Sequence, residues 1–441
     1  MWQPDRMKGA QVDRIDLAAG EKMHRWAQEL WPICRSITGP GIRQTLDWLE
    51  QRLPDLQRHR FATGTQVFDW TVPQEWEIRD AWIAHESGQR FAEFTRNNLH
   101  VMGYSAPLDV HLDREELLSL IHTQTDQPDV IPYVTSYYSP RSGFCMAERD
   151  RQSLPEGRYH AVIDSTLRDG ELVLGDLMIP GESAEEVLFT TYICHPSMAN
   201  NELSGPVLAA ALAEHVRSLP KRRLSYRFLF LAETIGAVAY LSRHLDTLRA
   251  NLKAGFVLSC VGDERAWSHV ESRYGATLAD QALAAALQGR APAHRYSFLE
   301  RGSDERQFCA PGVDLPVCGF CRSKYGTFPE YHTSADDLSL VTARGLGESH
   351  HAMRSIIDAF ELPPFPRVAV LGEPQLGKRG LYPTLSQKTA IHPARFRMNV
   401  LAYCDGTNSV FDICQRIGAN LADVVAELRV LIDHELVGPA V

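Results

Sequence analysis

The sequence lacks the long apolar segments that membrane insertion and export require. No run of about eighteen or more uncharged apolar residues occurs, which argues against a membrane-spanning helix. The first thirty residues mix charges throughout and contain neither the apolar stretch nor the small-residue cleavage site of a secretory signal. We therefore expect a cytoplasmic protein that makes no membrane contact.

An excess of positive charge is also missing. The chain has 45 Lys and Arg against 55 Asp and Glu, so its formal net charge is −10. A negatively charged chain repels polyanions, which disfavours nucleic acid as a partner. The charge balance therefore points to a small substrate.

The nine cysteines form no pattern typical of extracellular disulfides. Their number is odd and most lie inside apolar segments, as expected of reduced, buried thiols. Cys318 and Cys321 form the only CxxC, and no second pair accompanies it. Two interpretations stay open: two thiols packed beside a strand end, which we favour, or part of a structural zinc site.

Among the regions that the sequence does contain is a β-rich insert. Residues 63–154 hold short aromatic-rich runs separated by Pro, Gly and Asp, which predict a small β domain. One helix is expected over residues 113–124, with Asp113 as its cap. Several tryptophans and tyrosines of this insert are expected either to shape a pocket or to form an oligomer contact: Trp70, Trp76, Trp82, Tyr133, Tyr137 and Tyr138.

The insert interrupts a larger predicted α/β domain, formed by residues 1–62 and 155–362. Continuous apolar strands alternate there with amphipathic helices, which indicates a mostly parallel sheet sandwiched by helices. A hairpin is predicted around the turn at Arg168, Asp169 and Gly170. The expected core strands are 186–194, 225–232, 254–260 and 314–320, and the expected helices are 205–219, 235–250 and 278–289.

A small C-terminal unit follows the linker Pro363-Pro364-Phe365-Pro366. Residues 363–441 end in two amphipathic helices, the first with Ser409 as its cap, and predict a winged-helix-like domain. The unit carries eight Lys and Arg against seven Asp and Glu. That excess is too small for a strong phosphate footprint, so we expect an interaction or packing module.

Polar residues follow several of the predicted strands directly. In an open α/β sheet, ligands bind beyond the carboxyl ends of the strands. His195 and Glu233 each directly follow a predicted strand, and later loops carry Asp304, His332 and Asp336. We expect these side chains to meet at one edge of the sheet.

Histidines and carboxylates are ligands that zinc prefers, and a nearby carboxylate that is not a ligand can deprotonate water. We therefore expect His195 and His332 to bind a metal ion together with one or two acids. Glu233, emerging from a buried strand, would be the general base. Taken singly, a histidine at a strand end is also compatible with a structural hydrogen bond, and an acid there with a helix cap.

The order of these residues resembles that of the zinc exopeptidases, which include leucyl aminopeptidases, glutamate carboxypeptidase and glutaminyl cyclase. That family has a His after one core strand, an Asp three residues before Ser-Gly, and Glu-Glu-x-Gly after the next strand. Asp-Met-x-Gly, Ser-Asp-x-x-x-Phe and Tyr-His-Thr-x-x-Asp follow. The corresponding residues here, in the same order, are His195, Asn201 before Ser204-Gly205, Glu233-Thr234-Ile235-Gly236, Ser259-Cys260-Val261-Gly262, Ser303-Asp304 with Phe308, and Tyr331-His332-Thr333 with Asp336.

The resemblance covers roughly residues 158–345 and implies the zinc exopeptidase fold. The segments HPSMANNELSGP and GEPQLGKRGLYPTLS resemble one branch in particular. Its members are bacterial aminopeptidase-like proteins of undefined role, with an early β-rich insert and a C-terminal winged helix.

Three acidic positions of the family are occupied by neutral residues. Asn201 stands for the metal-bridging Asp, Thr234 for the second Glu and Ser259 for the third-strand Asp. A neutral amide cannot balance two neighbouring dications, so we expect one zinc ion per chain. Its expected ligands are His195, His332 and Glu202, with Asp304 as a less favoured third ligand.

Other matched residues are given supporting roles by the resemblance. Glu233 matches the general base of the family. Asn201, Asp304 and Asp336 would hold the ligands in place or contact the substrate. Tyr331 would either wall the pocket, which we favour, or hydrogen-bond a carbonyl oxygen.

The resemblance thus implies a metal-dependent amidohydrolase of the aminopeptidase type. Its substrate would be a small peptide or an N-acylated metabolite. The alternative is a degraded peptidase pocket that serves a ligand-binding or regulatory protein, with the C-terminal unit contacting DNA. A homo-oligomer is compatible with either function.

Overall fold

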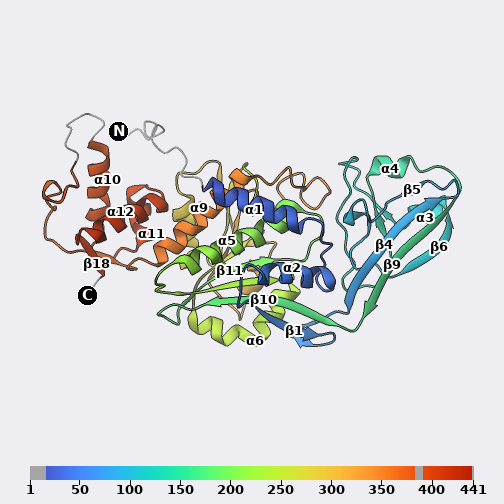
Figure 1. Ribbon diagram of the computed structural model, residues 1–441, viewed down its shortest axis with the longest axis horizontal. Coiled ribbons are helices and arrows are strands. Elements are labelled where there is room, and N and C mark those ends of the chain that lie inside the picture. Colours follow the sequence, from blue (N-terminus) through green and yellow to red (C-terminus); the bar gives the residue numbers. More distant parts are fainter. Residues whose placement is uncertain (1–15, 383–390, 440–441) are drawn as a thin grey trace.

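The computed structural model describes residues 16–382 and 391–439. An α/β domain occupies the middle of the elongated molecule, with the β-rich insert at one end and the C-terminal helices at the other (Figure 1). None of the helices in these two ranges is both long and apolar enough to cross a membrane.

An eight-stranded sheet forms the centre of the α/β domain, in the order β1-β10-β12-β11-β13-β16-β14-β15. The four inner strands β12, β11, β13 and β16 run parallel to one another, while β1 and β10 on one side are antiparallel. The predicted sheet is therefore confirmed. The strands are β1 (Gln57–Ala62), β10 (Glu171–Ile179), β11 (Glu186–Tyr192), β12 (Ser225–Leu231), β13 (Leu252–Leu258), β14 (Trp267–Val270), β15 (Ala293–Tyr296) and β16 (Val317–Cys321).

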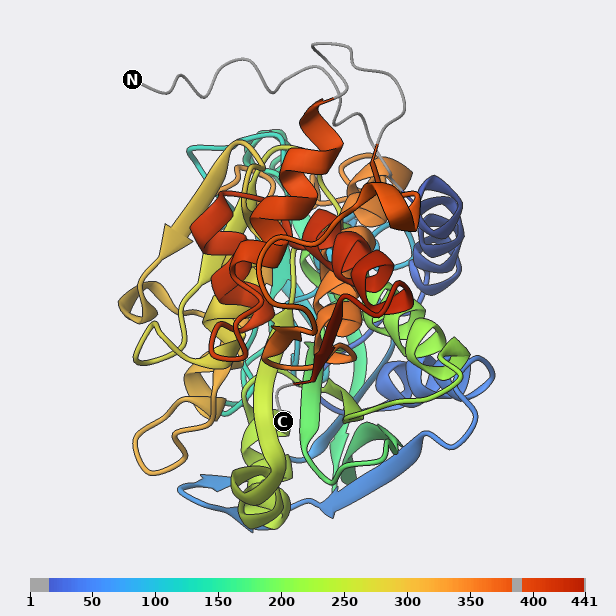
Figure 2. The same cartoon turned by 90° about the vertical axis from the view of Figure 1, so that its left-hand side faces the viewer.

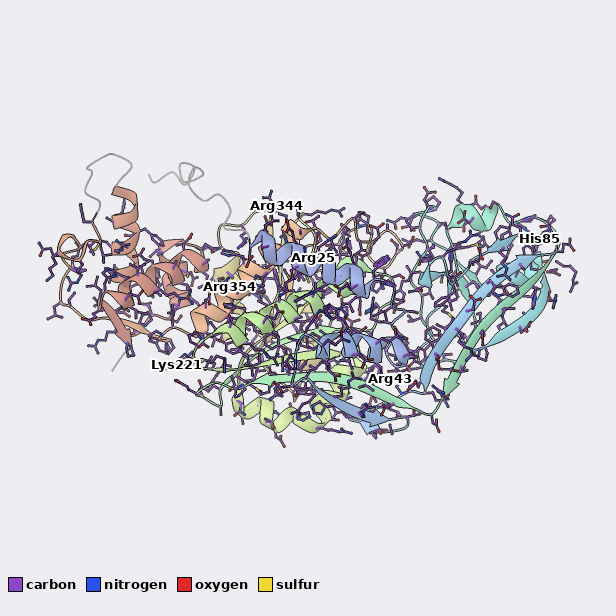
Figure 3. The ribbon with its side chains drawn as sticks, in the orientation of Figure 1. Arg25, Arg43, His85, Lys221, Arg344 and Arg354 are labelled. Atoms are coloured by element: carbon purple, nitrogen blue, oxygen red, sulfur yellow. The ribbon has the colours of Figure 1, made fainter. Side chains whose placement is uncertain are left out.

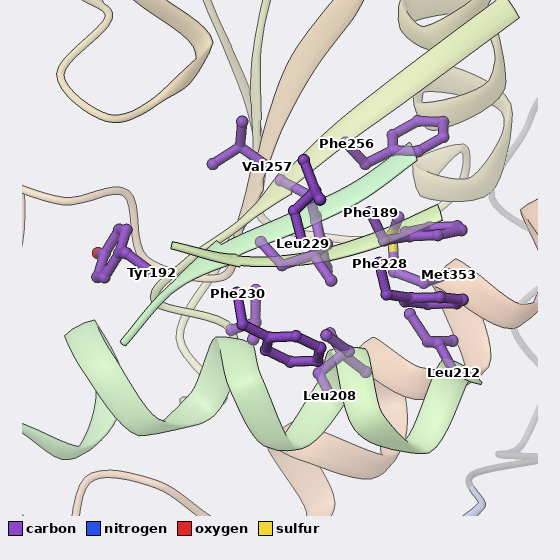
Figure 4. Packing of buried hydrophobic residues seen from close by; sticks show 14 of the residues in the cluster. Phe189, Tyr192, Leu208, Leu212, Phe228, Leu229, Phe230, Phe256, Val257 and Met353 are labelled. Carbon is purple, nitrogen blue, oxygen red and sulfur yellow. The ribbon is translucent and has the colours of Figure 1, made fainter. Parts of the chain in front are cut away.

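Helices cover both faces of this sheet. In Figure 1, α1, α5 and α9 lie above the sheet and α6 lies below it. Figure 4 shows the core between the sheet and α5, where Phe189 stacks between Phe228 and Phe256 with ring centroids 5.3 and 5.5 Å away. The helices are α1 (Leu17–Leu30), α2 (Pro40–Glu50), α5 (Ser204–Ser218), α6 (Ile235–Asn251), α7 (Leu278–Leu287), α8 (Glu305–Phe308) and α9 (Ala343–Phe360).

The insert contains its own antiparallel sheet, in the order β5-β4-β9-β6. Arg43 of α2, labelled in Figure 3, ties the insert to the central domain through two hydrogen bonds of 2.8 and 2.9 Å to the Glu75 carboxylate. The insert's elements are β2 (Gln66–Val67), β3 (Trp70–Thr71), β4 (Glu75–His85), β5 (Arg90–Phe91), β6 (Leu108–Asp113), α3 (Arg114–Leu118), β7 (Ile121–His122), β8 (Phe144–Cys145), α4 (Glu148–Gln152) and β9 (Arg158–Arg168).

Two predicted elements, one in the α/β domain and one in the insert, are wrong. The hairpin around Arg168 does not form, because β9 pairs with β4 and β6 whereas β10 pairs with β1 and β12. The chain leaves one sheet at this turn and enters the other, so the insert's sheet extends past residue 154. The predicted helix 113–124 ends at Leu118, although Asp113 does cap it through a capping box with Glu116.

The C-terminal unit consists of α10 (Ile391–Ala402), α11 (Val410–Ile417), α12 (Leu421–Asp433) and the strand pair β17 (Pro366–Val368) and β18 (Val437–Pro439). Ser409 and Asp412 form the capping box of α11, as expected. Figure 2 shows these helices in front of the central domain. The Asn420 amide donates to the carbonyl oxygens of Ala286 and Gln288 at the end of α7, and Arg429 pairs with Asp358 of α9 at 3.0 Å.

Candidate active site

His195 and Glu233 lie at the carboxyl ends of two neighbouring parallel strands. β11 ends at Tyr192 and β12 at Leu231, and these two residues are partners in the strand register. The residues that follow therefore leave the sheet side by side. His332 approaches from a distant loop, whose Thr333 is bridged to Pro132 of the insert.

Two carboxylates face the two nitrogens of the His195 ring. The Nδ1 atom lies 2.9 Å from Oε2 of Glu202, and the Nε2 atom lies 3.7 Å from Oε2 of Glu233. Burial alone would lower the pKa of His195, but the sulfur of Cys194 and the Glu202 carboxylate raise it well above its ordinary value. Because Glu202 favours a proton on Nδ1, Nε2 is the nitrogen that can exchange its proton for a cation.

A buried arginine holds Glu202 in this place. The side chains of Arg35 and Glu202 are both 0% exposed, and their Nε and Oε1 atoms lie 3.4 Å apart. Arg35 also donates from Nε to the carbonyl oxygen of His195 at 3.1 Å and from Nη1 to that of Leu30 at 2.8 Å. The charge of Glu202 is thus balanced by a guanidinium.

Glu233 is held with one oxygen free. Ser303 donates its hydroxyl to Oε1 at 2.9 Å, which leaves Oε2 directed at His195. Burial raises the pKa of the Glu233 carboxyl, and the nearby His195 charge opposes that shift. A carboxylate whose pKa moves toward neutrality is suited to general-base catalysis.

His332 is a buried imidazole whose ring packs near that of His195. The two ring centroids are 5.7 Å apart, and the Tyr133 ring of the insert packs edge-on against both. Tyr331 stacks on His332, with ring centroids 3.9 Å apart. Burial, with a smaller effect of His195, lowers the pKa of His332 to about 3, so its ring is neutral.

The spacing of the two rings matches that of two imidazoles on one metal ion. Since each nitrogen lies about 2.0–2.1 Å from zinc, two imidazoles on one ion have ring centres roughly 5–6 Å apart. The Nε2 atom of His332 and the Oδ1 atom of Asn201 are buried and have no hydrogen-bond partner. Buried polar atoms are rarely left unpaired, so these two atoms are suited to bind a cation.

A different group, Cys194, His195 and Glu202, has its ligand atoms within 4.8 Å of one another. We do not favour it as a metal site, because Arg35 already balances the Glu202 charge and would repel a dication. Burial also raises the pKa of the Cys194 thiol to about 11, which disfavours the thiolate that zinc needs.

A second such group, His269, Asp280 and Cys318, lies away from the strand ends discussed above. The Asp280 carboxylate accepts hydrogen bonds from His269, from Ser272 and from Thr277 at the start of α7. A carboxylate engaged in this way caps a helix, so we assign this group a structural role. Cys318 and Cys321 are both free, buried thiols.

The three positions that depart from the exopeptidase pattern are occupied as follows. Asn201 donates to the Tyr192 hydroxyl at 2.7 Å. The Ser259 hydroxyl faces the Cys321 sulfur at 3.7 Å. Thr234 has φ +63°, a conformation that strains a β-branched residue, and its hydroxyl accepts a hydrogen bond from Arg306.

Asp304 and Asp336 each hold a loop of the site in place. Asp336 accepts hydrogen bonds from the backbone N–H groups of Asn200 and Asn201 at 2.6 and 2.9 Å. Asp304 accepts one from the N–H of Thr234 at 2.8 Å. Burial raises the pKa of Asp336 to about 7, and burial together with the Glu233 charge raises the pKa of Asp304 to about 8.

Close backbone packing positions the loop that carries Asn201 and Glu202. At Gly205, which follows this loop, a Cβ atom would lie 2.2 Å from the Thr191 hydroxyl and 2.5 Å from the Leu258 carbonyl oxygen. Only glycine therefore allows α5 to begin so close to β11 and β13.

His195 and Glu233 lie at a cavity of about 280 Å³ between the central domain and the insert. The insert contributes Trp70, Tyr137 and Tyr138 to the lining of this cavity. The two roles expected for these residues were to shape a pocket or to form an oligomer contact. Their side chains take part in the pocket.

Four side chains that contact the candidate site residues were given no role from the sequence: Arg35, Cys194, Ser303 and Arg306. Ser303 and Arg306 lie within or beside the Ser-Asp motif and could have been found from it. Arg35 lies 160 positions from His195, and no periodic pattern connects the two.

Comparisons with known proteins place the chain in a family. Residues 24–362 match the family model described as "Domain of unknown function (DUF4910)". The chain belongs to this family. Residues 365–439 match a winged helix-turn-helix model, which confirms the predicted winged helix. A protein of Clostridium acetobutylicum, provisionally named a polysaccharide biosynthesis protein with aminopeptidase-like domain, is 41% identical to this DUF4910 chain over 402 residues, covering 90% of the chain and 92% of the relative.

Solved structures confirm the aminopeptidase-like fold of the DUF4910 chain. A Clostridium acetobutylicum protein, provisionally named a peptidase, superposes with a TM-score of 0.87 at 39% identity, covering 96% of this chain and 97% of the other. The zinc aminopeptidase BSAP from Bacillus subtilis superposes with a TM-score of 0.55 at 13% identity, covering 77% of this chain and 93% of that enzyme. This second likeness is one of fold.

Proposed function

We propose that this chain is a hydrolase that uses one zinc ion to cleave an amide bond in a small peptide or an N-acylated metabolite. The observation that carries the proposal is the position of Glu233, whose free Oε2 lies 3.7 Å from Nε2 of His195 at the end of a cavity. His195 and His332 would hold the ion through Nε2. Asn201 would add a neutral oxygen.

Glu202 has a different role in this proposal from the one expected from sequence. Its carboxylate faces Nδ1 of His195 and is balanced by Arg35. It therefore fixes the ring and its tautomer, as carboxylates commonly do for histidines that bind metals. Three acids are lost relative to the exopeptidase pattern, so the set suits one dication and not two.

Zinc in such a site supplies a Lewis acid that polarises a carbonyl group and makes water more acidic. Oε2 of Glu233 takes a proton from the attacking water, whose oxygen bonds to the carbonyl carbon. The C–N bond then breaks, and Glu233 returns the proton to the leaving nitrogen. Ser303 keeps the carboxylate oriented throughout, and the products are a carboxylic acid and an amine.

The test is a zinc titration of the metal-free protein, with amine release measured on a panel of dipeptides, N-acetyl amino acids and N-acetylated amino sugars. The sugars are included because of the name of the Clostridium relative. We expect activity to rise to a plateau at one zinc per chain. If activity requires two zinc ions, the site is a two-metal site. If compounds of the panel bind but none is turned over, the chain is a ligand-binding protein.

Replacing His332 by alanine should prevent zinc binding at this stoichiometry, because one of the two imidazole ligands is removed. The measurement is metal content by mass spectrometry after equilibration with zinc and desalting. His294→Ala is the matched control, since His294 lies on an exposed strand. Full zinc occupancy in His332→Ala would exclude His332 as a ligand.

We further infer that the winged helix packs against the central domain in place of binding DNA. The second helix of its helix-turn-helix motif, α12, would have to enter the major groove through its N-terminal end. That end is occupied by the contacts of Asn420 with α7. The test adds the full chain to a fluorescently labelled 30-base-pair duplex at physiological salt and measures the anisotropy. We expect no change up to about 10 µM protein, a concentration at which proteins that bind DNA non-specifically already raise the anisotropy. Salt-dependent binding would contradict this inference.

A further inference from the structure

Arg306 is a charged residue of the cavity that the proposed mechanism does not use. It lies on α8 and lines the same cavity as His195 and Glu233. Its Nη2 atom donates to the hydroxyl of Thr234, the residue next to Glu233. Its Nε atom is buried and has no hydrogen-bond partner.

The guanidinium of Arg306 forms no ion pair with any carboxylate of residues 16–382 or 391–439. Glu233 and Asp304 are close enough for its charge to act on them. Oε1 of Glu233 accepts a hydrogen bond from Ser303 and Oδ1 of Asp304 accepts one from the Thr234 N–H, while Oδ2 of Asp304 is buried without a partner and is not within ion-pair distance of Arg306. Glu233 is the only acid among the residues that line the cavity. If Glu233 serves as the base, no carboxylate remains to receive a substrate ammonium group.

We propose that Arg306 binds a carboxylate of the substrate, so that the preferred substrate is an N-acyl amino acid with a free carboxyl group and not a peptide with a free amino end. This inference rests on the proposed amide hydrolysis and specifies its substrate class. Guanidinium and carboxylate form strong, charge-assisted hydrogen bonds with defined geometry. Thr234 fixes the guanidinium next to Glu233, so the carboxylate is bound close to the amide that is cut.

The rest of the cavity suits the side chain of such a substrate. Trp70 and Tyr138 of the insert pack edge to face, with ring centroids 5.7 Å apart. Ile37 adds an aliphatic surface to the same cavity. An apolar amino acid side chain can pack on these groups while its carboxylate meets Arg306.

A purely structural role would also explain the bond to Thr234. Arg306 could simply brace the strained backbone of that residue, in which case its removal would impair all substrates equally. Recognition of a carboxylate would impair only substrates that carry one. A matched pair of substrates therefore separates the two roles.

The experiment compares N-acetyl-L-leucine with N-acetyl-L-leucinamide, using the zinc-loaded full chain. The ratio of kcat/KM for the acid to that for the amide is measured in the parent, Arg306→Gln and Arg306→Lys. Removing one charge-assisted contact should lower this ratio by about 10- to 100-fold in Arg306→Gln, with a smaller loss in Arg306→Lys. Arg301→Gln is the control, because Arg301 is an exposed arginine packed over Phe298 and should leave the ratio unchanged.

Calorimetric binding of the same two compounds separates this inference from the proposed function. Turnover with no preference for the acid, or with a preference that survives in Arg306→Gln, overturns the role of Arg306 and leaves the hydrolase intact. Binding without turnover, with a preference for the acid that Arg306→Gln abolishes, supports the role of Arg306 and overturns the hydrolase. If the protein shows no turnover and no preferential binding of the acid, both the role of Arg306 and the hydrolase are overturned.

Discussion

Replacing Glu233 by glutamine should lower kcat/KM by about 10²- to 10⁴-fold, the range that general-base catalysis contributes. Glutamine keeps the size of the side chain and can still accept the hydrogen bond from Ser303, but it cannot take a proton from water. The measurement is amine release from the best substrate of the panel, at saturating zinc.

The variant should still bind one zinc ion, because Glu233 is not among the proposed ligands. Glu115→Gln is the matched control, since Glu115 is exposed on α3 and far along the chain from the site. Equal activity in Glu233→Gln and the parent would remove the mechanism, whatever the metal content.

Replacing Arg35 by methionine should destabilise the protein by about 3–5 kcal/mol. Breaking a buried ion pair by removing one partner leaves an uncompensated buried charge, here on Glu202. The loss of the bonds to the carbonyl oxygens of Leu30 and His195 adds to the effect. The measurement is the midpoint of urea denaturation with the slope held constant.

A double variant provides the control for this effect. Arg35→Met combined with Glu202→Gln should be less destabilised than the sum of the two single variants, because the unpaired charge is then absent. Arg96→Met, at an arginine whose side chain is 75% exposed, should leave the midpoint unchanged. Strict additivity at positions 35 and 202 would show that the pair is not coupled.

The parts of the fold that could be predicted are those with strong apolar patterns. β11 and β12 consist almost entirely of buried residues, and their continuous apolar sequence marks them as inner strands of a parallel sheet. The cap of α11 was predictable because Ser409 and Asp412 stand at capping-box spacing. These signals are local, so tertiary contacts do not alter them.

The errors lie where local signals fit two structures. Residues 158–179 have the pattern of a hairpin, but alternation within a strand does not say which sheet the strand joins. Residues 119–124 continue a helical pattern weakly, yet Ile121 and His122 pair with β8 instead. In both cases a contact with a distant segment determines the outcome.

The site was predictable to the extent that chain position alone determines it. His195 and Glu233 follow adjacent strands, and the topology of the sheet brings them together. The commitment of Glu202 to Nδ1 of His195 depends on Arg35, and that contact joins residues far apart in the chain. A sequence pattern identifies candidate ligands, but it does not tell which nitrogen of a histidine each acid will face.

X-ray absorption of the zinc-loaded protein decides whether one zinc ion is bound by two imidazoles and no sulfur. We expect nitrogen and oxygen neighbours at about 2.0–2.1 Å with the scattering of two imidazole rings. Sulfur at about 2.3 Å would place the ion at Cys194 instead. A second zinc at about 3.5–4 Å would contradict the single-ion site.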